Sequence, residues 1–550
     1  MIAAAAVVVL TLALMASGKV EPLLALAGGL IVAGLLGISE PEDLLSGLSN
    51  PGVITVGAML VIAKGVVKTG VVSRVTWTLL SATTTSRQAI GRLSAPIGVA
   101  SALINTTPIV AMLIPAARQL EQTRRIPARE VLMPIAHVTT LAGSVTMIGT
   151  SSNLLIAGIA GQQGIEMGML SFAPVALPVA FAGSLLIFFI GPRLLRAEAS
   201  AKRPDKQWRV EIPIGSAALA AGRRAADLGI HSTRDYRLEG ILRWGDLVAA
   251  DEVIEAGDVL VFEATAAGVA AIWSTPLFGM GAHRLYEVSI SAGEGAELHE
   301  FERDGTMRII AARSERPLHE TELPPGETCF IAADNADAVA RNSAVALIQD
   351  AAARAPQPGK TWPALLILAA VILAASTGLA PTELSASAGA VLMVLTGVLT
   401  PRGAARALDP KVLAMLAGSI GLGTIVVDSG LADEIAEAMV SVATGPLALV
   451  IVLALVTAAM TNVVTNAATA SILAPVGITL AAQLDVDPVT VLALIGTCVS
   501  FTFLNPYGHQ TNVMVSEPGG YTSASFLRVG VPLLATVLVT VCATGWLLAR

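Results

Sequence analysis

Two short polar segments interrupt apolar stretches of the chain and carry side chains that can bind ions. They span residues 105–108 and 465–467 and read Asn-Thr-Thr-Pro and Thr-Asn-Ala. In the first segment, Thr107 can cap the helix that follows, and Pro108 suits the first position of that helix. The positive end of a helix favours an anion, whereas amide, hydroxyl and freed carbonyl oxygens suit a hard cation such as Na⁺. We therefore predict that both segments bind an anion and sodium.

Two further segments, residues 149–153 and 508–512, share the pattern Gly-x-x-x-Asn. Glycine lets the chain leave the helical conformation, and the last residues of each segment can start a new helix. The final Asn of each segment lies 47 or 46 residues beyond the central residue of the preceding polar segment, Thr106 or Asn466. Each break, together with the polar segment before it, would complete one cation site.

These four segments supply the predicted binding residues. The residues predicted to contact an anion are Asn105, Thr106, Thr107, Thr465, Asn466, Ala467, Ser152, Asn153, Thr511 and Asn512. The residues predicted to hold Na⁺ are Asn105, Thr106, Gly149, Asn466, Thr465 and Gly508. The alternative is that each segment is a buried polar connection that only joins helices. Their occurrence at matched positions favours the ion-binding interpretation.

The four segments contain no Lys or Arg, which limits how they can hold an anion. A helix end contributes roughly 0.3–2 kcal/mol toward binding a negative charge. A bare charge at the centre of a bilayer costs at least about 2.5–3.5 kcal/mol. Helix ends alone would not offset the charge of a dianion, so bound Na⁺ would supply the remainder and make coupling obligatory.

The other polar candidates are weaker. His509 lies inside the second break and is a candidate for proton coupling, whereas His137 lies in an apolar helix and is expected to be a core histidine. The three cysteines have neither metal-site nor disulfide-scaffold spacing. We find no nucleophile–base arrangement, Walker loop or dinucleotide fingerprint, so we do not expect an enzyme or a bound cofactor.

The composition shows what must position these segments. Of 550 residues, 54% are hydrophobic and only 14% are charged, compared with about 25% charged in soluble domains. Residues 197–360 hold 25 of the 41 acidic and 17 of the 34 basic residues. This distribution excludes a nucleic-acid binder, a disordered chain and an ordinary cytosolic enzyme. It predicts a polytopic α-helical membrane protein with a soluble insert.

The two apolar blocks, residues 1–196 and 361–550, repeat each other at an offset of 359–360 residues. The matched landmarks are Asn50-Pro51 with Asp409-Pro410, Thr69-Gly70 with Ser429-Gly430, Thr106 with Asn466, Pro115 with Pro475, and Gly149 and Asn153 with Gly508 and Asn512. Three pairs of matching loops carry net charge of opposite sign, which places them on opposite sides of the membrane. We therefore predict two inverted repeats, with broken helices in both.

The charges also predict a re-entrant hairpin over residues 93–117, because basic loops precede and follow these 25 residues. That length is too short for two crossings of about 20 residues each. Its tip would lie at the first polar segment. The second repeat should contain a matching hairpin that enters from the opposite side, with its tip at residues 465–467.

The insert is expected to be α+β and cytoplasmic, because basic residues follow the first membrane block. We divide it into two related domains, residues 197–280 and a divergent copy at 281–350, followed by a linker at 351–360. Candidate strands are Arg209–Ile214, Arg237–Arg243, Val259–Glu263, Leu285–Ile290, Met307–Ala312 and Thr328–Ala332.

At these residues the chain resembles the divalent anion:sodium symporter family, within the ion-transporter superfamily that includes arsenite permeases. The resemblance covers both membrane blocks and rests on the paired tips and breaks. The tips depart from the family pattern at Thr106, where Asn is usual, and at Ala467, where Thr is usual. The insert resembles paired TrkA-C regulatory domains, especially around residues 256–260, and members with such inserts look like sulfate-type permeases.

The resemblance implies a homodimer that moves a transport domain against a scaffold in an elevator mechanism. We predict a multi-pass symporter of the cell (inner) membrane, surrounded by lipid, that imports a small divalent anion with Na⁺. Sulfate is favoured over succinate or citrate, and the TrkA-C-like pair would bind a small cytoplasmic ligand or only support the dimer. One alternative is an arsenite-type or proton-coupled antiporter; another is a non-transporting nutrient sensor on a transporter fold.

Overall fold

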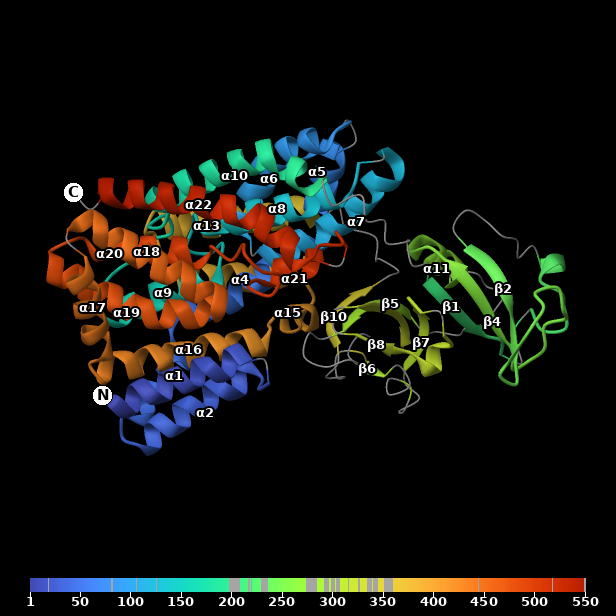
Figure 1. Cartoon of the computed structure of the whole chain (residues 1–550), viewed down its shortest axis with the longest axis horizontal. Helices are drawn as coiled ribbons and strands as arrows, with labels where there is room; N and C mark the ends of the chain where they lie inside the picture. The colour runs from blue at the N-terminus through green and yellow to red at the C-terminus, as the bar shows by residue number, and fades with distance from the viewer. Residues whose placement is uncertain are drawn as a thin grey trace. The chain divides into compact units, whose positions relative to one another are not determined.

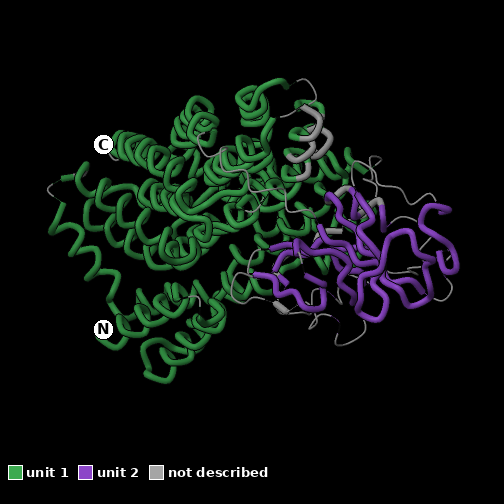
Figure 2. Tube along the Cα trace, turned by 45° about the vertical axis from the view of Figure 1, so that its right-hand side comes forward, with its two compact units in different colours: residues 1–199, 356–550 green, residues 200–355 purple. Residues whose placement is uncertain are grey.

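The chain, seen in a computed structural model, divides into two compact units, residues 1–199 with 356–550 and residues 200–355 (Figure 2). We call the first the membrane unit and the second the insert. The structure describes residues 1–17, 19–80, 83–104, 106–124, 126–196, 208–215, 218, 220–228, 236–273, 284–290, 296–297, 302, 307–314, 316–324, 327–333, 339, 345–350, 360–443, 445–516 and 518–548.

The membrane unit is helical, and its helices have the same order before and after the insert (Figure 1). Before it lie α1 (Ile2–Ser17), α2 (Pro22–Leu35), α3 (Pro41–Leu45), α4 (Pro51–Lys68), α5 (Val71–Leu80), α6 (Ser86–Leu103), α7 (Thr106–Arg124), α8 (Arg129–Gly143), α9 (Ser151–Gln162) and α10 (Ala173–Arg196). After it lie α13 (Thr361–Ser376), α14 (Thr382–Leu395), α15 (Pro401–Ala405), α16 (Pro410–Asp428), α17 (Leu431–Val442), α18 (Pro446–Val463), α19 (Asn466–Leu484), α20 (Pro488–Val499), α21 (Gln510–Ser516) and α22 (Ser523–Leu548).

Corresponding helices of the two sets have similar lengths. The pairs α1 and α13, α6 and α18, and α7 and α19 have 16, 18 and 19 residues per helix. Local chemistry matches as well, because α4 and α16 both begin at a proline that follows a capping side chain. Asn50 accepts a hydrogen bond from the Gly52 N–H at 2.8 Å, and Asp409 accepts from the Lys411 N–H at 3.1 Å. This correspondence is what an internal duplication requires.

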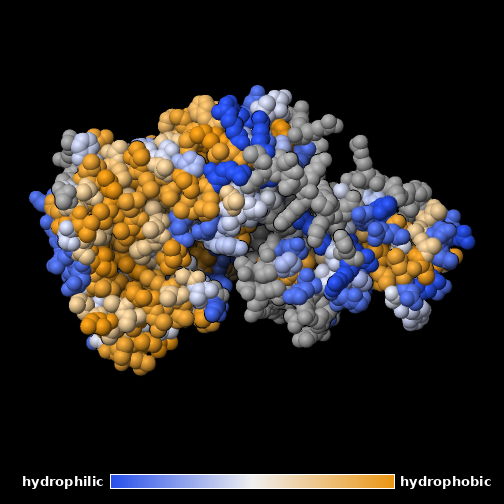
Figure 3. All heavy atoms as spheres, in the orientation of Figure 1, coloured by the Kyte–Doolittle hydropathy of each residue, from blue (hydrophilic) through white to orange (hydrophobic). Residues whose placement is uncertain are grey.

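The membrane unit carries the apolar segments and surface of a multi-pass membrane protein. Within the described residues, five helical segments are long and apolar enough to cross a membrane: Pro41–Lys68, Ala173–Arg196, Pro410–Asp428, Asn466–Leu484 and Ser523–Leu548. Large apolar side chains such as Leu35 and Leu379 are more than four-fifths exposed. In Figure 3 the visible face of this unit is largely hydrophobic. Together with the long apolar helices, such a surface is typical of a protein embedded in hydrocarbon.

Helices from the two halves pack directly on one another. α10 packs along α22, α4 along α14, and α16 along α2, and the first of these pairs lies side by side in Figure 1. One continuous hydrophobic core therefore contains buried residues of both halves, such as Ile62 and Leu533. Among the described residues, the smaller hydrophobic clusters of this unit also combine residues of both halves.

The predicted polar tips fall at helix junctions. α6 ends at Leu103 and α7 begins at Thr106, while α18 ends at Val463 and α19 begins at Asn466. The first helix pair is, however, longer than the 25 residues expected, because α6 already begins at Ser86 and α7 continues to Arg124. Basic residues that we assigned to loops lie within the ends of these helices, where long side chains can reach toward water. The length argument for a re-entrant hairpin therefore does not hold, and re-entrancy stays a prediction.

The insert contains an eight-stranded, fully antiparallel sheet with the strand order β10-β5-β9-β7-β1-β4-β2-β3. The strands are β1 (Trp208–Pro213), β2 (Tyr236–Arg243), β3 (Asp246–Val248), β4 (Val259–Ala264), β5 (Arg284–Ile290), β7 (Met307–Ala312), β9 (Thr328–Ala333) and β10 (Val345–Asp350). The helix α11 (Ala266–Trp273) follows β4, and β6 (Ala296–Glu297) pairs with β8 (Glu322–Leu323) in a second, small sheet. All six predicted strands are present to within one residue at either end. Pairing of β1 with β7 joins the two predicted copies into one sheet.

A buried carboxylate fixes the turn that enters β4. Arg243 donates two hydrogen bonds to Asp258, from Nε at 2.9 Å and from Nη2 at 2.8 Å. The Glu255 N–H donates a third hydrogen bond to the same carboxylate at 2.7 Å. The Arg243 guanidinium, opposed by burial and helped by the backbone N–H, holds the pKa of Asp258 below its usual value. The charged carboxylate therefore stabilises the folded insert.

Replacing Asp258 by Asn should destabilise this turn in a pH-dependent way. Because the folded pKa is depressed, the stabilisation is fully present above the ordinary carboxyl pKa of about 3.9 and is lost as pH falls through the folded pKa. Hydrogen exchange of the β4 peptide in the full-length protein should be faster in Asp258→Asn than in the unaltered protein near neutral pH. The difference in exchange rate between the variant and the unaltered protein should shrink only below about pH 4.

Glu263→Gln is the matched control on the same strand. Glu263 pairs with Arg237 at 2.8 Å, but the two side chains are 33% and 62% exposed, and such exposed ion pairs contribute little to stability. Exchange of β4 in this variant should match the unaltered protein. Equal effects of the two substitutions would contradict the role given to Asp258.

Candidate functional site

Both polar tips lie at the first turn of a helix. Thr106 opens α7 and is buried, and Thr107 beside it is half-buried. In the second half, Thr465 caps α19, because its hydroxyl accepts a hydrogen bond from the Ala468 N–H at 3.3 Å. Asn105 lies outside the described residues. The N–H groups of two 19-residue helices thus begin at the tips, as the anion-binding hypothesis requires.

In the first half, hydrogen bonds join the tip to the break that follows it. The Thr146 hydroxyl donates to the carbonyl oxygen of Ala102, one turn before the tip. The Ser101 hydroxyl donates to the carbonyl oxygen of Thr139 on α8 at 2.8 Å. The Thr146 hydroxyl also accepts from the Gly149 N–H at 3.1 Å. The tip and the break are therefore parts of one polar cluster.

The second half repeats this arrangement with different side chains. The Thr461 hydroxyl lies 2.6 Å from the carbonyl oxygen of Val499 and 2.9 Å from Oδ1 of Asn466. Asn505 Nδ2 donates to the carbonyl oxygen of Asn462 at 3.1 Å. Within each half the structure thus connects the tip with the break, the pairing expected for one cation site per half.

The final Asn of each break holds the non-helical segment before it. Asn153 Nδ2 donates to two backbone carbonyl oxygens within residues 144–146, at 2.9 and 3.0 Å. Asn512 Nδ2 donates in the same way to two carbonyl oxygens within residues 502–505, at 2.7 and 3.1 Å. Both Asn residues are buried. Asn153 Oδ1 is buried and has no hydrogen-bond partner among the described residues, so it is an oxygen available to a cation.

The two glycines of the breaks have different surroundings. A Cβ atom on Gly149 would lie 2.3 Å from the carbonyl oxygen of Gly143 and 3.0 Å from that of Ala102, so only glycine fits there. A Cβ atom on Gly508 would meet nothing closer than Asn505 Oδ1 at 3.2 Å. Close backbone approach therefore requires glycine in the first break more strictly than in the second.

The breaks also contact the hairpin of the other half. α9 packs on α19, and α21 packs on α7 and α8. Thr107 Oγ1 donates to Gln510 Oε1 at 3.2 Å, and the hydroxyls of Thr140 and Thr511 lie 3.4 Å apart. Sequence reasoning missed Gln510 and Thr140, because a contact between residues about 400 positions apart leaves no local pattern. It also missed Asn505, which lies in the break but outside the Gly-x-x-x-Asn pattern.

The remaining predicted residues also lie at these junctions. Ser152 is buried, and its hydroxyl lies 3.1 Å from the Thr150 hydroxyl. The carbonyl oxygen of Ala467 accepts from the Ser471 hydroxyl at 2.7 Å in the first turn of α19. Thr511 is buried, and its hydroxyl lies 2.7 Å from His509 Nδ1. The site is thus built from neutral hydroxyls, amides and backbone groups.

The described residues outside this cluster offer no metal centre. No group of three or more His, Cys, Asp or Glu side chains lies close enough to hold a metal ion. Both ring nitrogens of His137 are buried without a hydrogen-bond partner there, and its ring packs edge-on against Phe503 with the centroids 5.2 Å apart. His137 thus lies in an aromatic environment, as expected for a core histidine.

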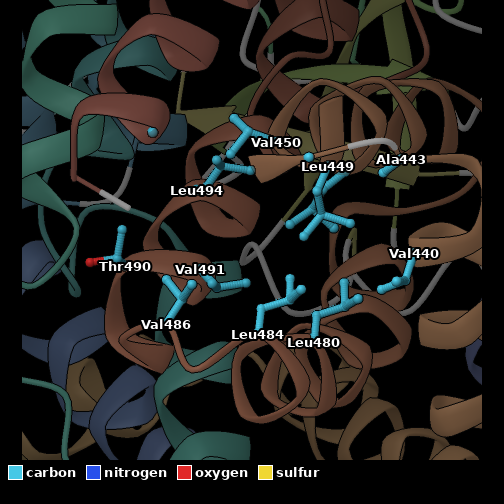
Figure 4. A pocket seen from close by; sticks show the side chains of 13 residues that line it. Val440, Ala443, Leu449, Val450, Leu480, Leu484, Val486, Thr490, Val491 and Leu494 are labelled. Carbon is cyan, nitrogen blue, oxygen red and sulfur yellow. The ribbon is translucent and has the colours of Figure 1, made fainter. Parts of the chain in front are cut away.

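A cavity of about 160 Å³ lies elsewhere, between the helices α17 to α20 and α22 (Figure 4). Its lining contains apolar residues such as Leu449, Val450 and Leu494, and Thr490 is the polar residue among those named in Figure 4. It contains none of the predicted binding residues. Without charged or N–H-bearing side chains this cavity does not suit an anion, so the polar cluster is the candidate site.

Comparisons with known proteins assign the chain to a transporter class. The family model described as citrate transporter matches residues 6–496. An uncharacterized transporter of Synechocystis sp. is 26% identical, over 93% of this chain and 90% of that protein. A putative sulfur deprivation response regulator of Chlamydomonas reinhardtii is 25% identical, over 92% of this chain and 95% of that protein. A probable sodium/sulfate cotransporter of the same alga is 28% identical, over 39% of this chain and 25% of its own length.

Gly149→Ala and Gly508→Ala form a matched pair that tests the geometry of the breaks. The first substitution places a methyl group against two carbonyl oxygens, and overpacking of this kind costs about 1–3 kcal/mol. The second needs only a shift of a few tenths of an ångström. We expect the thermal unfolding temperature of the detergent-purified protein to fall clearly for Gly149→Ala and to change little for Gly508→Ala. The reverse order would contradict the described packing.

Proposed function

The chain belongs to the citrate transporter family, and we propose that it imports a small divalent anion together with Na⁺. The observation that carries this proposal is the doubled polar cluster, in which the end of the helix before each tip is hydrogen-bonded to the break of the same half. The described side chains of this cluster are neutral. Neutral groups offset only part of the cost of an anion inside a membrane unit, and a co-bound cation would offset the rest.

The sodium sites would be built from oxygens at the tips and breaks. The proposed ligands are Asn105, Thr106 and Gly149 in the first half, and Thr465, Asn466 and Gly508 in the second. Asn153 Oδ1, buried and unpartnered among the described residues, supports a ligand position in the first half. Hydroxyl, amide and backbone carbonyl oxygens are ligands that a hard cation accepts. Na⁺ at these positions would bring positive charge next to the anion.

The anion would be held by N–H and O–H groups at the starts of the helices. The proposed contacts to the anion also include Thr107, Ala467, Ser152, Thr511 and Asn512. Sulfate is the favoured anion, because a relative over 39% of the chain is named a probable sodium/sulfate cotransporter. The citrate transporter family supports a small carboxylate as the other choice, and we propose a dicarboxylate such as succinate. Both are small and doubly negative.

Transport itself would follow from the duplication. The matching order of helices and the opposite loop charges support two inverted repeats. By resemblance, a homodimer would hold a scaffold in place while a transport domain carrying the tips moves across the inner membrane. The insert would then lie in the cytoplasm, where its two TrkA-C-like copies bind a small ligand and regulate uptake.

A second candidate function is a nutrient sensor that does not transport. The relative named a putative sulfur deprivation response regulator matches 92% of this chain, which favours this alternative. The same polar cluster would then bind the anion without moving it. Uptake measurements separate the two functions, because a sensor binds the anion but does not accumulate it.

Proteoliposomes containing the full-length protein test the symporter directly. An inward Na⁺ gradient should drive accumulation of radiolabelled sulfate or succinate severalfold above protein-free liposomes, and a K⁺ gradient should not. Binding without accumulation would support the sensor instead. Accumulation driven by a proton gradient alone would support the proton-coupled alternative and overturn sodium coupling.

Asn466→Ala tests the sodium site of the second half. Removing an amide that holds the cation should raise the Na⁺ concentration for half-maximal uptake by about tenfold or more, equivalent to about 1.4 kcal/mol. Thr479→Ala is the control on the same helix, because Thr479 bonds to Asp433 at 3.2 Å away from the tip. Unchanged sodium dependence in Asn466→Ala would remove this residue from the site.

A further inference from the structure

The hydrogen bonds around His509 fix which of its ring nitrogens carries the proton. The backbone N–H of Thr511 donates to His509 Nδ1 at 3.2 Å. A nitrogen that accepts a hydrogen bond cannot carry a proton, so the proton of the neutral ring lies on Nε2. Among the residues that the structure describes, no acceptor bonds to Nε2. His509 therefore presents an N–H donor.

Gln510 presents donors for a similar reason. Its Oε1 accepts a hydrogen bond from Thr107 Oγ1 at 3.2 Å, which orients the amide. The acceptor end is thus engaged, and the Nε2 end has no partner in the described part of the chain. Gln510 is exposed and His509 is half-buried, so a ligand can reach both donors. Two adjacent side chains offer neutral N–H groups.

These donors lie where the two halves of the molecule meet. Gln510 bonds to Thr107 of the first tip, and Thr511 lies beside Thr140 of α8. At the matched positions of the first break stand Thr150 and Ser151, whose hydroxyls can both donate and accept. The corresponding side chains of the second break differ, because the acceptor atoms of His509 and Gln510 are already occupied. The donor character is therefore specific to this half.

A site of free N–H donors distinguishes oxyanions by whether they carry a hydrogen. Sulfate accepts hydrogen bonds at every oxygen, so it satisfies the donors. Hydrogen phosphate has the same charge and similar shape, but its O–H group needs an acceptor. Against His509 and Gln510, whose free groups are donors only, that O–H finds no acceptor, and sites that leave a polar group unpaired can reject a ligand strongly.

We propose that His509 and Gln510 are specificity-determining residues of the anion site, and that they select a hydrogen-free oxyanion over hydrogen phosphate. This inference rests on the proposed function. It also gives His509 a role as a fixed hydrogen-bond donor in place of the proton carrier considered from the sequence.

Three variants in full-length proteoliposomes test the proposal. His509→Phe keeps a ring but removes the donor, so the KM for sulfate should rise about tenfold or more. His509→Gln restores an N–H at a similar reach, and its KM should stay within about threefold of the unaltered protein. Gln510→Glu replaces the donors by acceptors, so it should weaken sulfate uptake.

Competition by inorganic phosphate at about pH 8, where it is mainly the hydrogen-bearing dianion, gives the discriminating readout. A hundredfold excess of phosphate should not inhibit sulfate uptake by the unaltered protein. In Gln510→Glu the new carboxylate accepts from the phosphate O–H, so phosphate should compete at least about tenfold better relative to sulfate. Thr479→Ala should behave as the unaltered protein does.

The outcomes separate this inference from the proposed function. Thermal unfolding of each purified variant establishes that it is folded, and equilibrium binding of labelled sulfate accompanies uptake. If the unaltered protein neither binds nor accumulates sulfate, both proposals are wrong. If it does, but His509→Phe and Gln510→Glu leave the KM for sulfate and the ratio of phosphate to sulfate inhibition unchanged, this inference alone is overturned.

Discussion

A buried backbone in a hydrocarbon surrounding must have its polar groups satisfied from within the protein, and the rest of the membrane unit depends on this constraint. Two helices are interrupted, at residues 144–150 and 500–509, and each interruption frees carbonyl groups. The amides of Asn153 and Asn512 bond to two of these carbonyl groups each. The hydrogen bonds that satisfy the backbone at the breaks therefore also bring oxygen atoms close together in the membrane unit.

The neutrality of that network would explain how the proposed binding of an anion and Na⁺ is coupled. The gathered oxygens suit a cation, and the helix starts beside them suit an anion, but neither set carries a full charge. Each ion bound alone would leave its charge uncompensated in a medium of low dielectric constant. When both are bound, each offsets the cost of the other. A Lys or Arg in the cluster would bind the anion without sodium and so remove the reason for coupling.

Local features of this structure could be predicted from the sequence, and long-range ones could not. Glycine and asparagine mark the breaks, and Asn50 and Asp409 cap helices as their types suggest. The strands of the insert follow from their alternating apolar residues. The ends of the hairpin helices were misplaced, because an arginine such as Arg87 can lie in a helix and still reach water. The contact of Thr107 with Gln510 depends on packing between the halves, which no spacing within either half encodes.

The packing of α10 along α22 has a consequence for synthesis of the protein. α10 ends at Arg196, and its partner begins at Ser523, so the ribosome must add the insert and nearly all of the second half before the pair can form. At about 5–20 residues per second this takes some tens of seconds. During that time α8 can already pack on α10, but the part of α10 that later lies against α22, at Gly183 near Leu533 and Val537, has only lipid or an insertion factor to cover it. The nascent first half therefore stays in the membrane as an incomplete helix bundle until α22 has been synthesised. The rate of translation limits the assembly of the complete membrane unit.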